Sequence, residues 1–552
     1  MRLIIVGGVA AGASGAARTR RLDENAEIVI FERGDHVSFA NCGLPYYIGG
    51  DITERNRLLV QTAEGLRQRF RIDVRTRTEV LAIDRKARQV RVRGPDGTER
   101  QEPYDKLLLA PGAEPVRPPI PGIDDRRILT LRNLADTDRI KARVDAGARR
   151  ALVIGGGYIG LEMVEALRHR GLDVTVVEMA DQVMPPLDAE MAELLLRELK
   201  ANGVTVRLGS AAKAFTGSPA GITATLSDGS TVEADLVLVG VGVRPEVRLA
   251  KEAGLELGAT GGIAVDDRMR TSDPDIYAAG DAVEVTDPVT GRAALVPLAG
   301  PANRQGRIAA DNLCGRDSRY GGTLGTGIVK IFSLVAGMTG ANEKTLRRAG
   351  RRCEKVYLHP GSHAGYYPGA APMAMKLLFD PDDGRLLGAQ VVGTRGVDKR
   401  IDVLATALRA GMTVYDLERL ELCYAPPFGS AKDPVNMAGF IAANVLRGDH
   451  RLVQAETVAR GSVPDALVLD VRTRQEYDNG HIHNAVLIPL DELRQRLDEL
   501  PRDRPIHAYC KVGLRGYVAQ RLLCQRGYDA YNMTGGFTTF EAVRAVLERG
   551  GA

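Results

Sequence analysis

Short apolar runs followed by glycine-rich turns occur twice in the first half of the chain. Residues 2–12 read RLIIV and then GGVAAG, and a second apolar run leads to Glu32. The same order returns over residues 151–160, as ALVI and then GGGYIG, before a further apolar run that ends at Glu178. An apolar run bounded by turn residues is typical of a buried strand. The pattern predicts two strand–turn–helix–strand units, each ending in an acidic residue.

Each glycine-rich turn has the composition of a dinucleotide-binding site. Glycine lets the backbone approach a pyrophosphate, the helix N-terminus offers N–H groups, and a carboxylate about 20 residues further on accepts ribose hydroxyls. The alternative is two ordinary βαβ turns, and Val9 departs from the pattern because it stands where the middle glycine is usual. The residues expected to bind cofactor are Gly7, Gly12, Glu32 and Arg33 in the first unit, and Gly155, Gly157, Gly160 and Glu178 in the second.

Length and composition favour a globular protein of several domains. With 552 residues, 44% of them apolar, the chain has room for roughly three to four domains. Its net charge of +4 comes without a basic tail, which argues against nucleic acid as a partner. No apolar run reaches the roughly 18 residues of a membrane helix, and the first run is too short for a signal peptide, so a cytoplasmic protein without a membrane partner is expected. The six cysteines form no close C-x-x-C pair, which argues against a disulfide framework and against a metal site.

Two later segments connect these units to a known family. Residues 104–115, YDKLLLAPGAEP, and residues 271–281, TSDPDIYAAGD, resemble two further signatures of the pyridine nucleotide-disulfide oxidoreductases. The resemblance implies an α/β protein with two Rossmann-like dinucleotide-binding domains, in which Asp281 binds the ribityl chain of FAD. It also implies an α+β dimerisation domain through which the family forms homodimers.

A second resemblance covers the C-terminal part of the chain. Residues 466–482, the segment CKVGLRG at 510–516 and the turn TGGF at 534–537 are similar to rhodanese domains in order and spacing. The expected domains are FAD-binding at 1–148 and 265–324, NADH-binding at 149–264, dimerisation at 325–447, a linker at 448–457 and an α/β rhodanese domain at 458–552.

Cys42 is the candidate redox centre. Tyr47 stands where glutathione-reductase-like enzymes hold a second cysteine, so electrons must reach the substrate through one sulfur. The surrounding SFANCGLPYYIGG resembles the coenzyme A disulfide reductase branch, which includes coenzyme A persulfide reductases and some NADH oxidases. That resemblance implies a mixed disulfide between Cys42 and coenzyme A. Because only the thiolate is a nucleophile, we expect a helix dipole and the flavin environment to lower the pKa of Cys42; the alternative is a buried structural cysteine.

The same resemblance assigns residues to coenzyme A, the expected substrate. Arginine suits this task because its guanidinium grips phosphate in bidentate fashion, although the run RTRR also fits a solvated helix face. The assigned residues are Ser14, Arg18, Arg21, Ser38, Asn41, Asn303 and Lys432.

The family pattern also brings two tyrosines of the partner subunit to the active site. A phenol there can donate a proton to a departing thiolate. Tyr424 matches one of them, and the other is Tyr366 or Tyr367, with Tyr366 favoured. Packing at the subunit interface is the alternative role.

The second glycine-rich unit also indicates which nicotinamide coenzyme binds. Glu178 is expected to disfavour a 2′-phosphate, which favours NADH over NADPH. The resemblance implies that Tyr158 gates the nicotinamide site and that Glu162 orients the nicotinamide.

Cys510 is the second candidate thiol, because it opens a six-residue loop that ends at Arg515. Such a loop aims successive N–H groups at its centre and stabilises a thiolate or a persulfide. Asp470 and Arg472 resemble structural members of the rhodanese fold. A purely structural rhodanese module is the alternative.

These features predict a homodimeric FAD enzyme that reduces coenzyme A persulfide or disulfide with NADH, while Cys510 carries sulfane sulfur. One alternative is an NADH oxidase that cycles Cys42 through sulfenic acid, and another is a redox-responsive binding protein. Ala10 stands where peroxidase-like relatives place a histidine, which argues against a dedicated peroxidase. The sequence leaves open whether coenzyme A persulfide, coenzyme A disulfide, glutathione persulfide or polysulfide is the acceptor, and which subunit the rhodanese domain serves.

Overall fold

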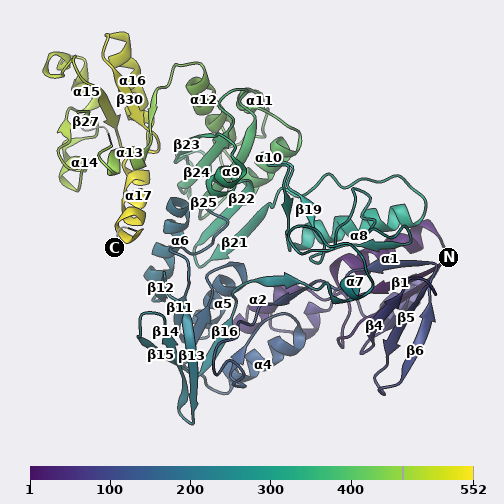
Figure 1. Cartoon of the computed structure of the whole chain (residues 1–552). Coiled ribbons are helices and arrows are strands. Elements are labelled where there is room, and N and C mark those ends of the chain that lie inside the picture. The colour runs from purple at the N-terminus through teal and green to yellow at the C-terminus, as the bar shows by residue number, and fades with distance from the viewer. Residues whose placement is uncertain (463–464, 551–552) are drawn as a thin grey trace. The chain divides into compact units, whose positions relative to one another are not determined.

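The computed structural model describes residues 1–462 and 465–550. The chain forms two compact units, Met1–Val177 with Ser210–Gly325, and Glu178–Gly209 with Thr326–Ala552 (Figure 1). The domain boundaries expected from the sequence stay predictions, because compactness divides the chain at other points. Over the described ranges, no helix has both the length and the apolar character needed to cross a membrane.

The first unit contains a five-stranded parallel sheet in the order β18-β7-β1-β2-β3. Its strands are β1 (Arg2–Val6), β2 (Glu27–Phe31), β3 (Asp73–Arg75), β7 (Lys106–Leu109) and β18 (Ile276–Ala278). The central strand β1 is apolar from Leu3 onward, as expected for a strand covered on both faces, and Leu3, Ile4 and Ile5 are fully buried. Helix α1 (Ala10–Leu22) follows the first glycine turn and packs against α8 (Ala299–Leu313), far away in sequence (Figure 1).

A second parallel sheet in this unit repeats the design, with strands in the order β11-β10-β16-β9. These strands are β9 (Ile128–Leu129), β10 (Arg150–Ile154), β11 (Asp173–Val177) and β16 (Leu236–Val239). Helix α5 (Tyr158–His169) follows the second glycine turn and packs against α2 (Leu44–Gly49), the helix just after Cys42. The two sheets confirm the predicted pair of Rossmann-like units.

Smaller antiparallel sheets and short helices complete the first unit. The strands are β4 (Glu79–Asp84), β5 (Gln89–Arg93), β6 (Glu99–Pro103), β8 (Ala113–Pro115), β13 (Ala212–Ser218), β14 (Gly221–Leu226), β15 (Thr231–Ala234), β17 (Val243–Pro245), β19 (Val285–Thr286) and β20 (Ala293–Ala294). The helices are η1 (Asn41–Gly43), η2 (Arg55–Leu58), α3 (Ala63–Phe70), α4 (Leu134–Asp145) and α7 (Arg248–Glu252).

The second unit contains an antiparallel sheet in the order β21-β22-β25-β24-β23, so β23 is an edge strand. Its strands are β21 (Gly327–Ile331), β22 (Leu334–Gly340), β23 (Glu354–Leu358), β24 (Met373–Phe379) and β25 (Leu386–Gly393). The accompanying elements are α6 (Ala189–Ala201), β12 (Thr205–Arg207), α9 (Glu343–Ala349), α10 (Val397–Arg409), α11 (Val414–Arg419) and α12 (Pro434–Leu446). Strands β24 and β25 are buried along their whole length, and α10 packs on the sheet.

The same unit ends in a parallel sheet in the order β26-β30-β29-β27-β28. Its elements are β26 (Leu452–Val453), α13 (Ala455–Ala459), β27 (Leu467–Asp470), α14 (Arg474–Asp478), β28 (Val486–Leu487), α15 (Leu490–Leu493), η3 (Leu497–Glu499), β29 (Ile506–Tyr509), α16 (Leu514–Gln525), β30 (Ala530–Met533) and α17 (Gly536–Gly550). This α/β part agrees with the predicted rhodanese fold and packs on its own chain, since α17 contacts α6 and Arg549 pairs with Glu193 at 2.6 Å.

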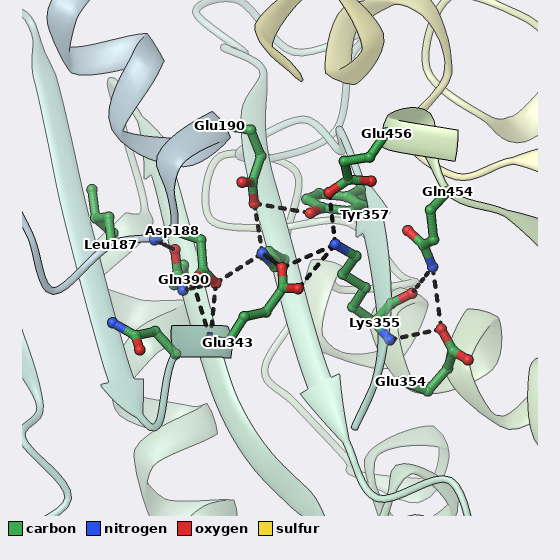
Figure 2. A network of polar contacts seen from close by, with 12 residues as sticks. Leu187, Asp188, Glu190, Glu343, Glu354, Lys355, Tyr357, Gln390, Gln454 and Glu456 are labelled. Carbon is green, nitrogen blue, oxygen red and sulfur yellow. Dashed lines mark hydrogen bonds and ion pairs between the residues drawn. The ribbon is translucent and has the colours of Figure 1, made fainter. Parts of the chain in front are cut away.

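A buried charge network joins the parts of the second unit. The ammonium of Lys376, which has no exposed surface, pairs with Asp188 at 2.8 Å, with Glu190 at 2.5 Å and with Glu343. Figure 2 shows these carboxylates converging from two separate segments, the start of α6 for Asp188 and Glu190 and the start of α9 for Glu343. Burial alone lowers the pKa of Lys376, but the field of Glu190 and its neighbours outweighs this and raises the pKa well above its usual value.

A lysine further along the network reaches the C-terminal part of the chain. Lys355 pairs with Glu343 at 3.0 Å and with Glu456 of α13 at 2.7 Å (Figure 2). The Tyr357 hydroxyl donates to Glu190 at 2.9 Å. The network therefore holds α6, the edge strand β23 and the start of the rhodanese part together.

Replacing Lys376 with methionine is expected to lower the free energy of unfolding of the second unit by about 3–5 kcal/mol, because two buried carboxylates and the half-buried Glu343 lose their shared counter-ion. Urea unfolding followed by circular dichroism measures the change. The exposed Lys200 of α6 provides the control, since Lys200→Met removes no buried ion pair. Adding Glu190→Gln and Glu343→Gln to Lys376→Met should recover most of the lost free energy of unfolding. A loss below about 1 kcal/mol for Lys376→Met alone would contradict the stabilising role of the charge network.

Candidate active sites

The first glycine turn has the geometry that a dinucleotide phosphate requires. Gly7 has a φ of +94°, and a Cβ on Gly12 would lie 1.9 Å from the Gly7 carbonyl oxygen, so the helix can approach the strand this closely only through glycine. Helix α1 begins after Val9 without a side-chain cap, which leaves its first N–H groups available to an anion. The Glu32 carboxylate accepts hydrogen bonds from the backbone of Gly8 at 2.9 Å and of Gly34 at 2.8 Å.

The second glycine turn repeats this geometry. Gly155 has a φ of +105°, and a Cβ on Gly160 would lie 2.0 Å from the Gly155 carbonyl oxygen. A Cβ on Gly157 would point into open space, and α5 begins at the next residue, Tyr158, without a side-chain cap. The turn therefore offers room and N–H groups for a second pyrophosphate. Both turns fit the expected nucleotide cofactors.

Each of the two acidic residues lies directly after the strand that closes its glycine-rich strand–helix–strand motif. Glu32 follows β2, and Glu178 follows β11. The Glu178 carboxylate accepts from the Ala180 backbone at 2.8 Å, and its own N–H donates to the Arg207 carbonyl at 2.8 Å. Arg33, next to Glu32, is exposed and pairs with Glu114 at 2.9 Å.

Cys42 lies in the short helix η1, immediately before α2, and is exposed. Its pKa is raised, first by desolvation and then by the negative fields of Glu162 and Asp281. Burial and the two carboxylates therefore outweigh the lowering of the Cys42 pKa that was expected from a helix dipole. Of the two expected causes of a lower pKa, only the flavin remains. Glu162 and Asp281 therefore lie close enough to Cys42 to act on its charge, although the three residues are far apart in the sequence.

Glu162 is the centre of this group. Its pKa is raised to about 7 by burial and by Glu165, and its field, after burial, helps to raise the pKa of Tyr158 to about 12. Burial and Glu162 also raise the pKa of Tyr46 to about 12, with a smaller contribution from Cys42. Tyr46 was not among the site residues expected from the sequence. The signal that could have indicated it is its position four residues after Cys42. Asp281 has a raised pKa because it is desolvated.

The residues assigned to coenzyme A are brought together only in part. The Ser14 hydroxyl of α1 donates to the Asn303 side chain of α8, so these two meet. Arg18 pairs with Asp311 at 2.7 Å and is therefore partly neutralised. Arg21 is exposed, with its guanidinium 5.6 Å from the Phe70 ring centroid, and stays available to phosphate.

Three further assigned residues lie on loops or, for Asn41, at the start of the short helix η1. Ser38 has a φ of +47°, and its N–H donates to the Gly8 carbonyl at 2.8 Å, which ties the Cys42 segment to the first glycine turn. Asn41, beside Cys42, is exposed. Lys432 is exposed in the second unit, just before the N-cap of α12.

Two of the tyrosines lie in contact in the second unit. The hydroxyls of Tyr366 and Tyr424 are 2.8 Å apart, and the side chains are 76% and 47% exposed. This hydrogen bond raises the pKa of Tyr366. Tyr367 instead packs edge-on against His363, with ring centroids 5.7 Å apart. The contact favours Tyr366 over Tyr367 as the partner of Tyr424.

Cys510 is fully buried at the end of β29, in a loop whose backbone turns toward its sulfur. The Gly513 N–H donates to Cys510 Sγ at 3.1 Å. Arg515 makes two hydrogen bonds to Glu476, at 2.7 and 2.6 Å, which raise the pKa of Arg515 and help to lower that of Glu476 to about 2. A loop with an inward N–H and a fixed cation at its rim suits a sulfur anion.

Asp470 and Arg472 form a buried pair behind this loop. Arg472 donates to both carboxylate oxygens of Asp470, at 2.9 and 2.6 Å, and Tyr509 donates to Asp470 at 2.6 Å. Arg472 also stacks over Phe537 at 4.4 Å. These contacts are consistent with the expected structural roles.

Comparison with known protein families gives three matches along the chain. Residues 1–306 match the pyridine nucleotide-disulphide oxidoreductase family, residues 327–434 match the dimerisation domain of that family, and residues 454–542 match the rhodanese-like domain.

Individual proteins show the same similarity. A coenzyme A disulfide reductase from Staphylococcus haemolyticus is 38% identical over 447 residues, which are 80% of this chain and all of that protein. The crystal structure of reduced Bacillus anthracis CoADR-RHD superposes with a TM-score of 0.97 at 49% identity and covers 99% of this chain and 98% of that chain. A NAD-dependent persulfide reductase from A. fulgidus superposes with a TM-score of 0.92 at 38% identity, over 98% of this chain and 100% of that one.

Proposed function

Because the chain belongs to the pyridine nucleotide-disulphide oxidoreductase family, we propose that it reduces coenzyme A persulfide and coenzyme A disulfide with NADH. It works as a homodimer that binds FAD and handles sulfane sulfur in its rhodanese domain. The observation that carries this proposal is that an exposed thiol, Cys42, lies within the electrostatic reach of Glu162 and Asp281, the residues expected to meet nicotinamide and flavin. We further propose a cytoplasmic site of action, because NADH is the electron donor.

The proposed reaction begins with the Cys42 thiolate. It attacks the coenzyme A sulfur of the persulfide, the S–S bond breaks, and sulfide leaves as a Cys42–coenzyme A disulfide forms. When bound, FAD accepts a hydride from NADH and supplies two electrons to sulfur. Coenzyme A thiol then leaves and Cys42 returns to the thiolate. Overall, one persulfide, one NADH and one proton give one coenzyme A thiol, one hydrogen sulfide and one NAD⁺.

Other residues of the chain bind the substrate and move protons. Ser14, Asn303 and exposed Arg21 lie on α1 and α8, where Arg21 can bind a phosphate of coenzyme A. The hydrogen-bonded phenols of Tyr366 and Tyr424 can donate a proton to a departing thiolate, and we propose that they serve the other subunit of the dimer.

The test is steady-state NADH oxidation with the purified FAD-loaded protein, without oxygen. Coenzyme A persulfide and disulfide should each support turnover, with sulfide released only from the persulfide. In a separate aerobic assay without a sulfur acceptor, NADH oxidation at a rate equal to or above the persulfide rate would instead support the NADH oxidase. No acceptor-dependent turnover at all would support the redox-responsive binding protein.

Replacing Glu178 with alanine is expected to narrow the preference for NADH over NADPH by at least about tenfold in kcat/KM. The carboxylate accepts ribose hydroxyls and repels a 2′-phosphate, and the adjacent Arg207 can pair with that phosphate once Glu178 is gone. Asp181→Ala removes a nearby acid away from the strand end and serves as the control. An unchanged coenzyme ratio in Glu178→Ala, or faster wild-type turnover with low concentrations of NADPH, would contradict the assignment.

A further inference from the structure

The edge strand β23 meets the rhodanese part at the turn beside the Cys510 loop. As the last strand of its sheet, β23 has backbone groups on one side without a strand partner. The Tyr357 N–H on that side donates to the Thr534 hydroxyl at 2.9 Å. The Tyr357 side chain is anchored in the buried charge network through Glu190 (Figure 2). The turn after β30 is thus tied to a strand that lies outside the rhodanese fold.

His359 makes a second contact, with the helix that directly follows this turn. It lies two residues after Tyr357, and its Nε2 is 2.9 Å from the Thr539 hydroxyl in the first turns of α17. Desolvation, followed by the positive field of Lys511, lowers the pKa of His359 to about 4. The imidazole is therefore neutral at ordinary pH, so the contact is a hydrogen bond of constant charge. Lys511 is the residue directly after Cys510, which places His359 near the sulfur loop.

Residues 534–539, which receive these contacts, pack directly against the Cys510 loop. The Phe537 N–H donates to the Cys510 carbonyl at 2.8 Å, and the Thr538 N–H donates to the Lys511 carbonyl at 3.0 Å. A Cβ on Gly536 would lie 2.8 Å from the backbone nitrogen of Gly513, the residue whose N–H donates to Cys510 Sγ. No space remains between the turn and the loop.

Contact on the opposite side of the turn is equally close. A Cβ on Gly535 would lie 2.8 Å from the Tyr357 Cβ and 2.1 Å from the Thr539 hydroxyl oxygen. The edge strand, the turn and the Cys510 loop are therefore three layers in direct contact. A shift of the His359–Thr539 pair is expected to move the Gly513 N–H that faces the Cys510 sulfur, because close-packed layers transmit displacement.

We propose that Tyr357 and His359, which lie outside the rhodanese fold, are positioning residues that hold the Cys510 loop in the geometry needed to stabilise a sulfur anion. The proposal rests on the proposed role of Cys510 as sulfur carrier. In that step the Cys510 thiolate takes the outer sulfur of a persulfide R–S–SH, the S–S bond breaks, R–SH leaves, and Cys510 becomes the persulfide. Strand β23 and the residue that follows it, both outside the rhodanese fold, thus contribute to the geometry of the Cys510 site.

The test measures the reactivity of Cys510 directly in the full-length, FAD-loaded protein. Iodoacetamide alkylation of the Cys510 peptide is followed by mass spectrometry as a function of pH. His359→Phe should raise the midpoint of the alkylation profile by about one pH unit, and slow both alkylation at neutral pH and sulfur transfer from glutathione persulfide by about tenfold, because alkylation follows the thiolate fraction. Thr539→Val should do the same, and the double variant should lose no more than either single variant.

His359→Gln retains a nitrogen near the Nε2 position and should restore most of the reactivity. Alkylation of Cys42 in the same samples and NADH-driven reduction of coenzyme A disulfide should stay within about twofold of the wild type, since neither uses the loop. A Cys510 profile in His359→Phe and Thr539→Val that equals the wild-type profile would overturn the proposal. Alkylation needs no turnover, so this result would be distinct from a protein that fails to reduce coenzyme A persulfide.

Discussion

Replacing Cys42 with serine will reduce NADH-driven turnover of coenzyme A persulfide and disulfide by at least about a thousandfold, the scale expected when a reacting nucleophile is removed. Serine keeps the size of the side chain but cannot form the disulfide through which electrons reach the substrate. FAD should stay bound and should still be reduced by NADH, because the glycine turns and the two acidic strand ends are unchanged. The variant therefore separates the first half of the reaction from the second.

Absorbance spectroscopy measures both halves. Bleaching of the flavin by NADH without oxygen reports its reduction, and coenzyme A release reports turnover. Cys314→Ser is the matched control, because Cys314 is also a free cysteine whose pKa is raised mainly by desolvation. Retention of more than about a tenth of wild-type turnover in Cys42→Ser would remove Cys42 from the reaction path.

The two glycine turns were predictable because their function depends on local geometry. A strand, a turn that requires positive φ, and an acid at the next strand end are all encoded within about 30 residues. The order of motifs also predicted the two Rossmann-like units and the rhodanese part. The electrostatics of Cys42 was not predictable in this way. Its environment comes from Glu162 and Asp281, and only the folded chain places their charges near the thiol.

Contacts between distant segments account for the other differences. Arg18 looked like a free cation in the run RTRR, but α8 supplies Asp311 to pair with it. Lys376 is the only polar residue of its strand, β24. Nothing local in the sequence indicates that three acids from two other segments surround its ammonium. Such partners depend on tertiary packing, which periodicity does not encode.

Replacing Cys510 with serine will abolish sulfur transfer from persulfides or thiosulfate, again by at least about a thousandfold, while NADH-driven reduction of coenzyme A disulfide stays within about twofold of the wild type. The reason is a division of roles between the two thiols. Cys510 is fully buried in a loop that directs an N–H at its sulfur and carries the fixed guanidinium of Arg515, a setting that holds a persulfide. No second cysteine lies in that loop, so it offers no dithiol to accept electrons.

Measuring four activities in both variants, namely reduction of coenzyme A disulfide, of coenzyme A persulfide and of polysulfide, and sulfur transfer to a thiol, gives eight rates that distinguish the possible couplings. Cys42→Ser should lose reduction of coenzyme A disulfide and of polysulfide but keep sulfur transfer to an added thiol. Cys510→Ser should keep reduction of coenzyme A disulfide. If sulfur reaches Cys42 only after delivery by Cys510, reduction of polysulfide should fall in Cys510→Ser more than reduction of coenzyme A persulfide. Equal loss of every reductase rate in Cys510→Ser would instead make Cys510 a member of the electron path, and the division of roles between the two thiols would be wrong.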